Sequence, residues 1–233
     1  MRYQLISFDL DGTLVDTAAE IAEAANAALA AHGLARRPQA EVTRLIGCGA
    51  RVLVRGLLAP RVGAPPGQAL RVSEDAALAT FEASYASSAG KRCAPYPGCG
   101  PALSRLRSAG LRLACVTNKQ LQHARAVLRA TGLEPFFDLV IGGDSLAHRK
   151  PHASVLQHVV AALGADPAWT AHVGDSSTDV LAARAAGVTA WAVPYGYNAG
   201  VAVEHSAPDR MFDDLTQVAD FVLADHRARR ETE

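Results

Sequence analysis

The sequence predicts an α/β protein in which a mainly parallel sheet is interrupted once by a helical insertion. Short apolar runs that end in Gly, Asp, Asn or Pro recur along the chain, and segments of helical length separate the later ones. Between the first and second runs lie about a hundred residues with no convincing strand. This alternation favours a sheet with helices on both faces, and the long interval favours a separate helical unit.

Five runs are predicted to be strands because they are short, apolar and followed by turn residues. They cover residues 4–9, 111–117, 139–141, 171–174 and 189–193. In sheets of this kind, ligands bind beyond the carboxyl ends of the strands. We therefore expect a Rossmann-like parallel sheet core with the functional site at that edge.

Residues 15–94 are expected to form the inserted helical cap domain, and residues 1–14 and 95–233 to form the α/β core. The first cap helix begins with a predicted capping box, Thr17 with Glu20, and stops at Gly33. Its apolar face comprises Ile21, Ala25, Ala28 and Leu29. The last cap helix carries Leu70, Ala77, Leu78, Phe81 and Tyr85 at similar spacing. The Pro- and Gly-rich segment 94–101 is typical of a boundary or hinge.

Composition narrows the class of function. A chain of 233 residues that is 49% hydrophobic can bury at least one full core. Lys plus Arg equal Asp plus Glu at 23 each, so charge favours a small-molecule substrate over nucleic acid. Acidic residues interrupt the N-terminus where a signal peptide would be apolar, and no stretch reaches membrane-spanning length, which predicts a cytoplasmic protein with no membrane partner.

The first strand ends in a paired acidic motif, Asp9-Leu10-Asp11-Gly12-Thr13. Residues i and i+2 of an extended chain point to one side, so the two carboxylates are expected to converge. Their repulsion would keep one protonated unless a cation intervenes, which suits one to nucleophilic attack and the other to proton transfer. Gly12 lets the backbone turn sharply beside a ligand. A simple acidic turn is the alternative interpretation.

Three more polar clusters follow later strands. Thr117 and Asn118 offer a hydroxyl and backbone amides to phosphate oxygens, although a helix N-cap explains the same residues. Lys150 stands beside Pro151 in a chain with only three Lys among 23 basic residues, which indicates a need for a compact point charge. Asp175 and Asp179 supply hard oxygen ligands that suit magnesium, or else begin a helix.

Four such clusters in succession, each at a strand's carboxyl end, resemble a known family. In the motifs FDLDGT, VTNK, RKP and GDSSTD the chain resembles the haloacid dehalogenase superfamily, specifically its phosphatases with an inserted helical cap. In IGCGARVLVRGLL, VIGGD, HVGDSSTDV and PYGYN it is similar to the bacterial phosphoglycolate phosphatases. The resemblance implies hydrolysis of 2-phosphoglycolate to glycolate and phosphate through a magnesium-assisted aspartyl phosphate.

The resemblance also implies roles for individual residues. Asp9 would be the nucleophile, and Asp11 the general acid/base and, through its carbonyl, a magnesium ligand. Thr117 and Lys150 would hold phosphate. Magnesium would also be bound by Asp9 and Asp175, with Asp179 orienting metal-bound water or Lys150. Further substrate-binding and supporting residues would be Thr13, Asn118, Gly12 and Gly174. The chain departs from the family pattern at Ala153, where a second proline is usual, and at Cys48, where Asn is common.

Arg51 is expected to bind the carboxylate of phosphoglycolate. A glycine-flanked loop at residues 47–50 opens a predicted helix, whose unpaired N–H groups favour an anion, and a guanidinium can clamp a carboxylate with two hydrogen bonds. The alternative is an ordinary solvated arginine in a helix that also carries Arg55.

Other functions stay open at this point. A phosphatase for a phosphorylated amino sugar or for pyrophosphate, and a sugar phosphomutase, fit the same motifs. The dehalogenase branch is disfavoured because its motif lacks the second Asp. A catalytically silent binding module is disfavoured because no motif residue is missing. The protein is expected to act as a monomer or a homodimer.

Overall fold

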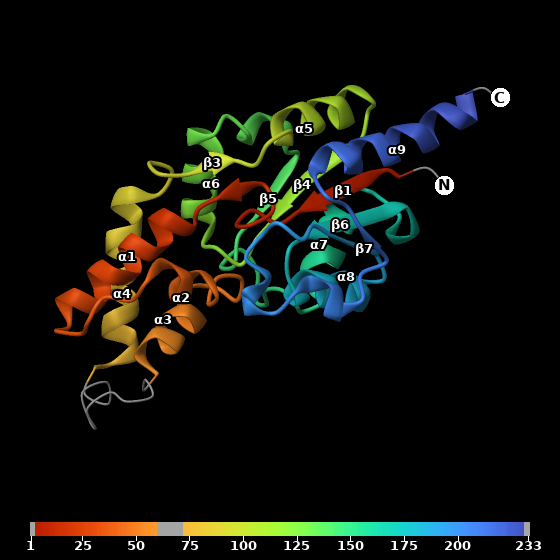
Figure 1. Ribbon diagram of the computed structural model, residues 1–233. Coiled ribbons are helices and arrows are strands. Elements are labelled where there is room, and N and C mark those ends of the chain that lie inside the picture. Colours follow the sequence, from red (N-terminus) through yellow and green to blue (C-terminus); the bar gives the residue numbers. More distant parts are fainter. Residues whose placement is uncertain (1–2, 60–71, 231–233) are drawn as a thin grey trace.

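A six-stranded parallel sheet forms the centre of the molecule in the computed structural model, which describes residues 3–59 and 72–230 (Figure 1). The strand order is β5-β4-β1-β6-β7-β8, and every neighbouring pair is parallel. The strands are β1 (Leu5–Phe8), β4 (Arg112–Val116), β5 (Leu139–Ile141), β6 (Thr170–Gly174), β7 (Thr189–Ala192) and β8 (Arg210–Met211). The five predicted strands and the α/β fold are confirmed; β8 was not predicted.

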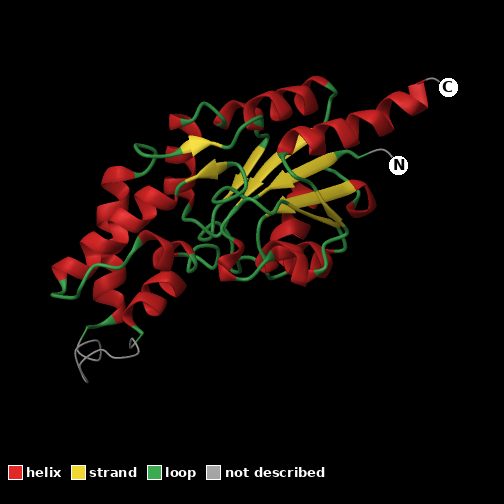
Figure 2. Cartoon of the chain, viewed as in Figure 1, coloured by secondary structure: helices red, strands yellow, loops and turns green. Residues whose placement is uncertain are grey.

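Helices cover both faces of this sheet (Figure 2). One buried cluster joins the sheet to α5 (Cys99–Ser108), α6 (Leu121–Ala130) and α9 (Leu215–Arg230). A second cluster, on the other face, joins it to α7 (Ser154–Ala162) and α8 (Ser177–Ala186). Each buried Leu, Val or Phe contributes about 1.5–3 kcal/mol, which fixes the strands and therefore their carboxyl ends. In the described part of the chain, no helix is both long and apolar enough to cross a bilayer.

Four helices form a separate group beyond the carboxyl ends of the strands (Figure 1). They are α1 (Ala18–Ala31), α2 (Gln39–Thr43), α3 (Ala50–Leu58) and α4 (Glu74–Ser88), here called the helical region. It encloses its own buried cluster, which includes Ile21, Leu53 and Phe81. Leu70 lies outside the described residues. The assignment of residues 15–94 to a cap and of 1–14 and 95–233 to a core stays a prediction.

Two chain connections join the sheet to the helical region. They contain β2 (Val15–Asp16) and β3 (Ala94–Pro95), which pair antiparallel with Val15 opposite Pro95. Two-residue strands leave no periodic pattern, so these two could not be predicted from the sequence. Their pairing brings the outgoing and returning connections side by side.

The capping box predicted at the start of α1 is wrong. Thr17 precedes the helix, but its Oγ1 donates to Asp11 Oδ1 at 2.6 Å. Glu20 accepts hydrogen bonds from Tyr85 Oη at 2.6 Å and from Gly90 N at 3.0 Å. Both side chains are almost fully buried, so they satisfy distant polar groups that water cannot reach instead of the local helix end.

Candidate active site

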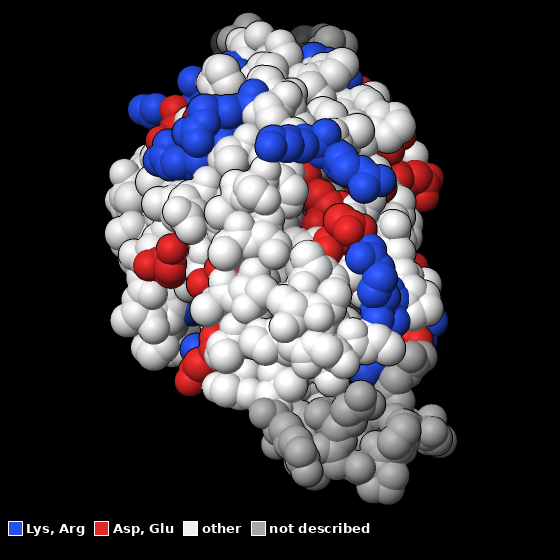
Figure 3. Space-filling model, turned by 90° about the vertical axis from the view of Figure 1, so that its left-hand side faces the viewer, with Lys and Arg blue, Asp and Glu red and all other residues white. Residues whose placement is uncertain are grey.

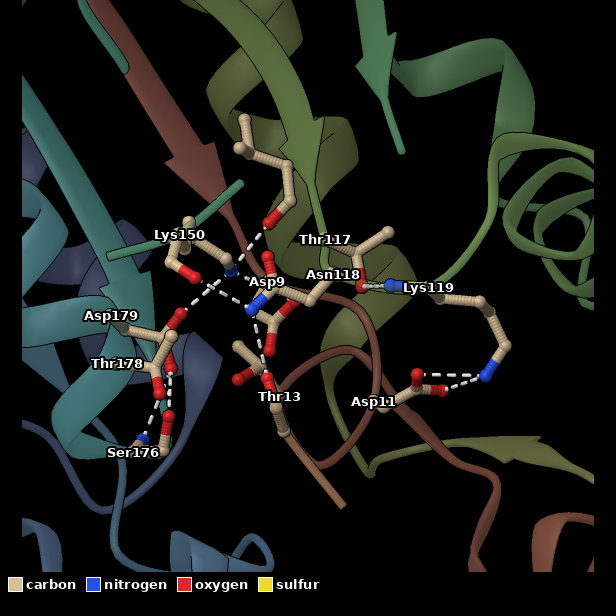
Figure 4. A network of polar contacts seen from close by, with 12 residues as sticks. Asp9, Asp11, Thr13, Thr117, Asn118, Lys119, Lys150, Ser176, Thr178 and Asp179 are labelled. Atoms are coloured by element: carbon tan, nitrogen blue, oxygen red, sulfur yellow. Dashed lines mark hydrogen bonds and ion pairs between the residues drawn. The ribbon is translucent and has the colours of Figure 1, made fainter. Parts of the chain in front are cut away.

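The four polar clusters predicted from the sequence meet at the carboxyl edge of the sheet (Figure 4). Asp9 follows β1, Thr117 follows β4 and Asp175 follows β6, while Lys150 lies in the loop after β5. The parallel pairing of β1 with both β4 and β6 aligns these strand ends. Residues far apart in the chain therefore share one small volume.

Three buried carboxylates form the centre of the site. Asp9, Asp175 and Asp179 are 5%, 3% and 1% exposed, and each offers an oxygen within 4.8 Å of the others. Burial raises the pKa of Asp9 to about 6, with Lys150 opposing the shift. Burial, together with the charges of Asp179 and Asp9, raises the pKa of Asp175 well above its usual range. The fold thus disfavours the ionised cluster unless a cation joins it.

The cluster fits a divalent cation. Asp9 Oδ1 is buried and accepts no hydrogen bond from the described residues, although Lys150 Nζ lies 3.0 Å away as an ion pair. Asp175 uses Oδ2 to accept hydrogen bonds from Tyr197 N and Asn198 N. Within the described ranges, its Oδ1 has only a 3.4 Å contact from Thr13 Oγ1. Carboxylate oxygens with spare lone pairs are the ligands that hard divalent cations prefer.

Lys150 is held rigidly as a charged group. Its Nζ donates to Val116 O at 2.6 Å and to Asp179 Oδ1 at 2.7 Å, beside the ion pair with Asp9. Burial acts to lower the pKa of Lys150, but Asp179 and Asp9 outweigh it and raise the pKa above its ordinary value. An ammonium is thereby fixed 3.0 Å from the proposed nucleophile.

Asp179 acts as a support in this arrangement. Besides Lys150, its Oδ1 contacts His172 Nε2 at 3.2 Å, and its Oδ2 accepts from Ser176 N and Oγ at 3.1 and 2.7 Å. Burial acts to raise the pKa of Asp179, but Lys150 and His172 hold it well below its usual range. His172 was missed in the sequence, where it is one ordinary residue of a strand. A Cβ on Gly174 would overlap Asp179, which explains a glycine there.

The carboxylate of Asp11 lies apart from this cluster. Lys119 Nζ donates to its two oxygens at 2.6 and 2.7 Å. The sequence argument paired Asp11 with Asp9, whereas the carboxylates close to Asp9 are those of Asp175 and Asp179. Lys119 was not among the predicted site residues. The signal was present, since the rarity of lysine that singled out Lys150 applies equally to Lys119.

The remaining predicted residues divide between the site and its supports. Thr117 lines the cavity described below, and its Oγ1 accepts from Lys119 N at 3.2 Å. Asn118 also lines it, and its Nδ2 donates to Lys150 O at 2.9 Å and to Gly47 O at 3.0 Å. Asn118 therefore bridges the sheet edge and the helical region. Thr13 is fully buried and contacts Asp175, and Gly12 has a φ of 85° where a Cβ would overlap the same carboxylate.

A cavity lies between the sheet edge and the helical region, with an empty volume of about 550 Å³ including its open mouth. The sheet side supplies polar walls: Asp9, Asp11, Thr117, Asn118, Lys119, Gln120 and His123. The helical region supplies mostly apolar walls: Ile21, Leu45, Ile46, Gly47, Gly49, Ala50, Leu53, Phe81, Glu82 and Tyr85. Gln120 Nε2 donates to Glu82 Oε1 at 2.6 Å across the cavity. Every wall from the helical region was absent from the predicted site.

Lys119 is the only Lys or Arg among the described residues that line this cavity. Its Nζ lies 4.8 Å from the centre of the Tyr85 ring, a favourable cation–π position. The ring of His123 meets Tyr85 edge-on at 5.1 Å. Burial and the charge of Lys119 lower the pKa of His123, so its imidazole is neutral at neutral pH. The cavity therefore presents the ammonium group of Lys119 to an anionic ligand.

Arg51 is not brought to this cavity. Its guanidinium pairs with Glu74 Oε1 at 3.0 Å and Asp75 Oδ1 at 2.7 Å, and the side chain is 45% exposed. Arg55 pairs with Glu74 as well. The acidic first turn of α4 lies next to α3. Its carboxylates bind Arg51 in place of the substrate carboxylate that was expected there. Cys48, at the position that often carries Asn, lies with its Sγ 3.7 Å from Thr178 Oγ1.

Comparison with known proteins identifies the family. A family model described as haloacid dehalogenase-like hydrolase matches residues 3–187. The chain belongs to this family of hydrolases. The resemblance drawn from the four motifs is thereby confirmed, and the protein is an enzyme of the hydrolase class.

This hydrolase is similar to several proteins named phosphoglycolate phosphatase. It is 34% identical over 223 residues to a phosphoglycolate phosphatase of Psychrobacter arcticus, covering 96% of this chain and 97% of that protein. It is 43% identical over 192 residues to the protein named "Phosphoglycolate phosphatase, plasmid" of Cupriavidus necator, covering 82% and 81%. A crystal structure of a predicted phosphoglycolate phosphatase from Haemophilus somnus 129PT superposes with a TM-score of 0.87 at 32% identity, covering 95% of this chain and 98% of that one.

Proposed function

We propose that this hydrolase is a cytoplasmic, magnesium-dependent phosphoglycolate phosphatase, acting as a monomer or homodimer, that converts 2-phosphoglycolate and water to glycolate and phosphate. The observation that carries the proposal is that one cavity is lined both by Asp9, whose carboxylate is paired with the buried Lys150, and by the ammonium group of Lys119. The first pair suits a phosphoryl group and Lys119 suits the carboxylate of the same small molecule. The names of the relatives support the same substrate.

The first chemical step is transfer of the phosphoryl group to Asp9. An oxygen of Asp9 attacks phosphorus in line with the glycolate oxygen, so the new P–O bond forms as the old one breaks. Lys150, Thr117 and nearby backbone amides hold the phosphoryl oxygens. Magnesium, held by Asp9, Asp175 and the carbonyl of Asp11, would neutralise phosphoryl charge when bound.

Asp11 serves proton transfer in both steps. Protonated, it gives its proton to the departing glycolate oxygen, and as a carboxylate it then takes a proton from the water that hydrolyses the aspartyl phosphate. Lys119 holds the Asp11 carboxylate in an ion pair. A substrate carboxylate that binds Lys119 competes for this ion pair and frees the Asp11 carboxyl group to contact the departing oxygen.

The surroundings of the site also fit a small substrate. The apolar walls from Leu53 and Phe81 leave little room for water beside a bound substrate, which strengthens the electrostatic interactions inside the cavity. Basic and acidic side chains are interspersed on the face drawn in Figure 3, so the described surface there carries no continuous basic area for a polyanion.

The test is a turnover screen of phosphorylated metabolites with and without Mg²⁺. We expect kcat/KM to be highest for 2-phosphoglycolate, and chelation to lower turnover at least about a hundredfold, because a bound cation contributes several kcal/mol to transition-state stabilisation. Added Mg²⁺ should restore activity, and Ca²⁺ should restore much less because its coordination is larger and looser. A higher efficiency with a sugar phosphate or pyrophosphate would contradict the substrate, and full activity after exhaustive chelation would contradict the cation.

Substitution of Lys119 tests how the carboxylate is recognised. Lys119→Met keeps most of the length of the side chain and removes its charge, so kcat/KM for 2-phosphoglycolate should fall by an amount equivalent to about 1.5–3 kcal/mol. Phenyl phosphate, which lacks the carboxylate, should lose at least about tenfold less. The matched control Arg51→Met should leave both substrates unchanged. Equal losses on both substrates for Lys119→Met would mean that Lys119 serves Asp11 alone.

A further inference from the structure

The loop that follows β7 holds both connections to the helical region. It contains the PYGYN segment at residues 194–198, for which the proposed chemistry has no use. Tyr195 Oη donates to Thr13 O at 2.7 Å on the outgoing connection. The ring of Tyr195 also lies 4.5 Å from that of Tyr96 on the returning connection.

Tyr197 makes the stronger attachment. Its hydroxyl accepts a hydrogen bond from Thr17 N at 2.6 Å and donates one to Asp16 Oδ1 at 2.7 Å, where the chain enters α1. Its side chain is half-buried and packs against the buried cluster of the helical region. Thr17 in turn donates to Asp11. The side chain of Tyr197, which comes from the sheet side, is therefore hydrogen-bonded to the residues that lead into α1.

The backbone of the same residue holds a carboxylate of the central cluster. The N–H groups of Tyr197 and Asn198 donate to Asp175 Oδ2 at 2.6 and 3.2 Å. A Cβ on Gly196 would overlap both this oxygen and Gly12 O, so the loop lies directly against the cluster. Asp175 and the base of α1 are thus linked through a single residue.

The loop is also stiff enough to transmit a shift. Asn198 and Ala199 adopt positive φ values of 55° and 47°, which cost energy unless the surroundings fix them. The side chain of Asn198 does so, with Nδ2 donating to Pro194 O at 3.2 Å and Oδ1 accepting from Val203 N at 3.2 Å. A movement of Asp175 would therefore displace Tyr197, because the loop between them has little freedom to adjust.

We propose that Tyr197 is a positioning residue that couples a divalent cation at the carboxylate cluster to the orientation of the helical region. The inference rests on the cation site of the proposed function. The helical region supplies the walls at Leu53, Phe81 and Tyr85, so its orientation sets the shape of the cavity. The hydroxyl of Tyr197 transmits the coupling, because it is the group that reaches Thr17 and Asp16.

The test measures amide hydrogen exchange with and without Mg²⁺ in the wild type and in Tyr197→Phe, which keeps the ring and both backbone N–H groups. The informative amide is that of Tyr96, which donates to Leu14 O on the other connection. Because the side chain of Tyr96 also bonds to that of Tyr197, exchange with and without Mg²⁺ is compared within each protein and not between them. In the wild type, Mg²⁺ should slow its exchange about fivefold or more, the lower end of typical coupling between sites. In Tyr197→Phe the slowing should fall below about twofold.

Calorimetry of Mg²⁺ binding supplies an independent readout. Coupling is reciprocal, so Tyr197→Phe should weaken Mg²⁺ affinity by about the factor by which the slowing is lost. Tyr3→Phe makes the same chemical change at the opposite end of β1 and should behave as the wild type in both measurements.

Several outcomes would overturn the inference. If Mg²⁺ slows Tyr96 exchange equally in the wild type and in Tyr197→Phe, or if the variant only speeds exchange by one factor with and without Mg²⁺, the hydroxyl is merely structural. If Tyr197→Phe does not fold, Asp16→Ala, which removes the acceptor of the hydroxyl, must lose the slowing. If the wild type binds no Mg²⁺, the cation site of the proposed function fails together with the inference.

Discussion

Asp9→Asn is expected to lower kcat for 2-phosphoglycolate by at least about 10⁴-fold, the scale of losing a nucleophile. A neutral amide neither attacks phosphorus nor neutralises a cation. The substitution is nearly isosteric and removes one of three carboxylates that repel one another, so the fold should be retained. Phosphate release and thermal unfolding, measured on the same preparation, check both parts.

The matched control for this variant is Asp75→Asn, which makes the same change at a side chain that is 80% exposed on the helical region. It should turn over substrate as the wild type does. Activity of Asp9→Asn within about tenfold of the wild type would rule out a covalent intermediate on Asp9. Loss of the fold in Asp9→Asn would instead mean that Asp9 is needed for folding. That result is not expected, because Asp9 Oδ1 accepts no hydrogen bond from the described residues.

Asp11→Asn is expected to slow turnover about 10²- to 10⁴-fold with alkyl phosphates such as 2-phosphoglycolate, the usual contribution of a positioned acid/base. An amide cannot protonate the leaving oxygen. With 4-nitrophenyl phosphate, whose leaving group needs little protonation, formation of the aspartyl phosphate should be slowed far less. The pre-steady-state burst of nitrophenolate isolates that first step.

A similar loss in the first step for both kinds of leaving group would contradict the acid role of Asp11. It would point to the ion pair with Lys119, since Asn leaves that ammonium without its partner in the cavity. Asp144→Asn, on an exposed loop near the start of α6, provides the comparison for an amide introduced outside the cavity.

Five strands of the central sheet were predictable from residues alone. Each strand is a short apolar run with a turn behind it, and parallel pairing then requires that Asp9, Thr117 and Asp175 share an edge. The same local logic explains Gly12, whose positive φ follows from the sharp turn after β1. The motif residues were therefore identifiable before any contact was known.

Contacts between distant segments could not be read in the same way. Thr17 and Glu20 have the spacing of a capping box, yet both are buried and form hydrogen bonds with Asp11 and Tyr85 instead. Arg51 lies in a loop suited to an anion, yet the acidic start of α4 occupies it. In each case a partner far away in sequence offers a stronger interaction than the local one, and pairing of that kind leaves no spacing pattern.

The sequence by itself determined the fold class and the side chains at the sheet edge, because strand periodicity and turn chemistry act over a few residues. The family followed from the resemblance of the motifs FDLDGT, VTNK, RKP and GDSSTD. Only the tertiary structure decided which of those side chains pair with one another. It joins Asp9 to Asp175 and Asp179, gives Asp11 to Lys119, and closes the cavity with walls from the helical region. The physical reason is that charge pairing and burial depend on distances across the folded chain. Parallel strand pairing sets these distances at the sheet edge, whereas the distances to the inserted helices depend on tertiary packing.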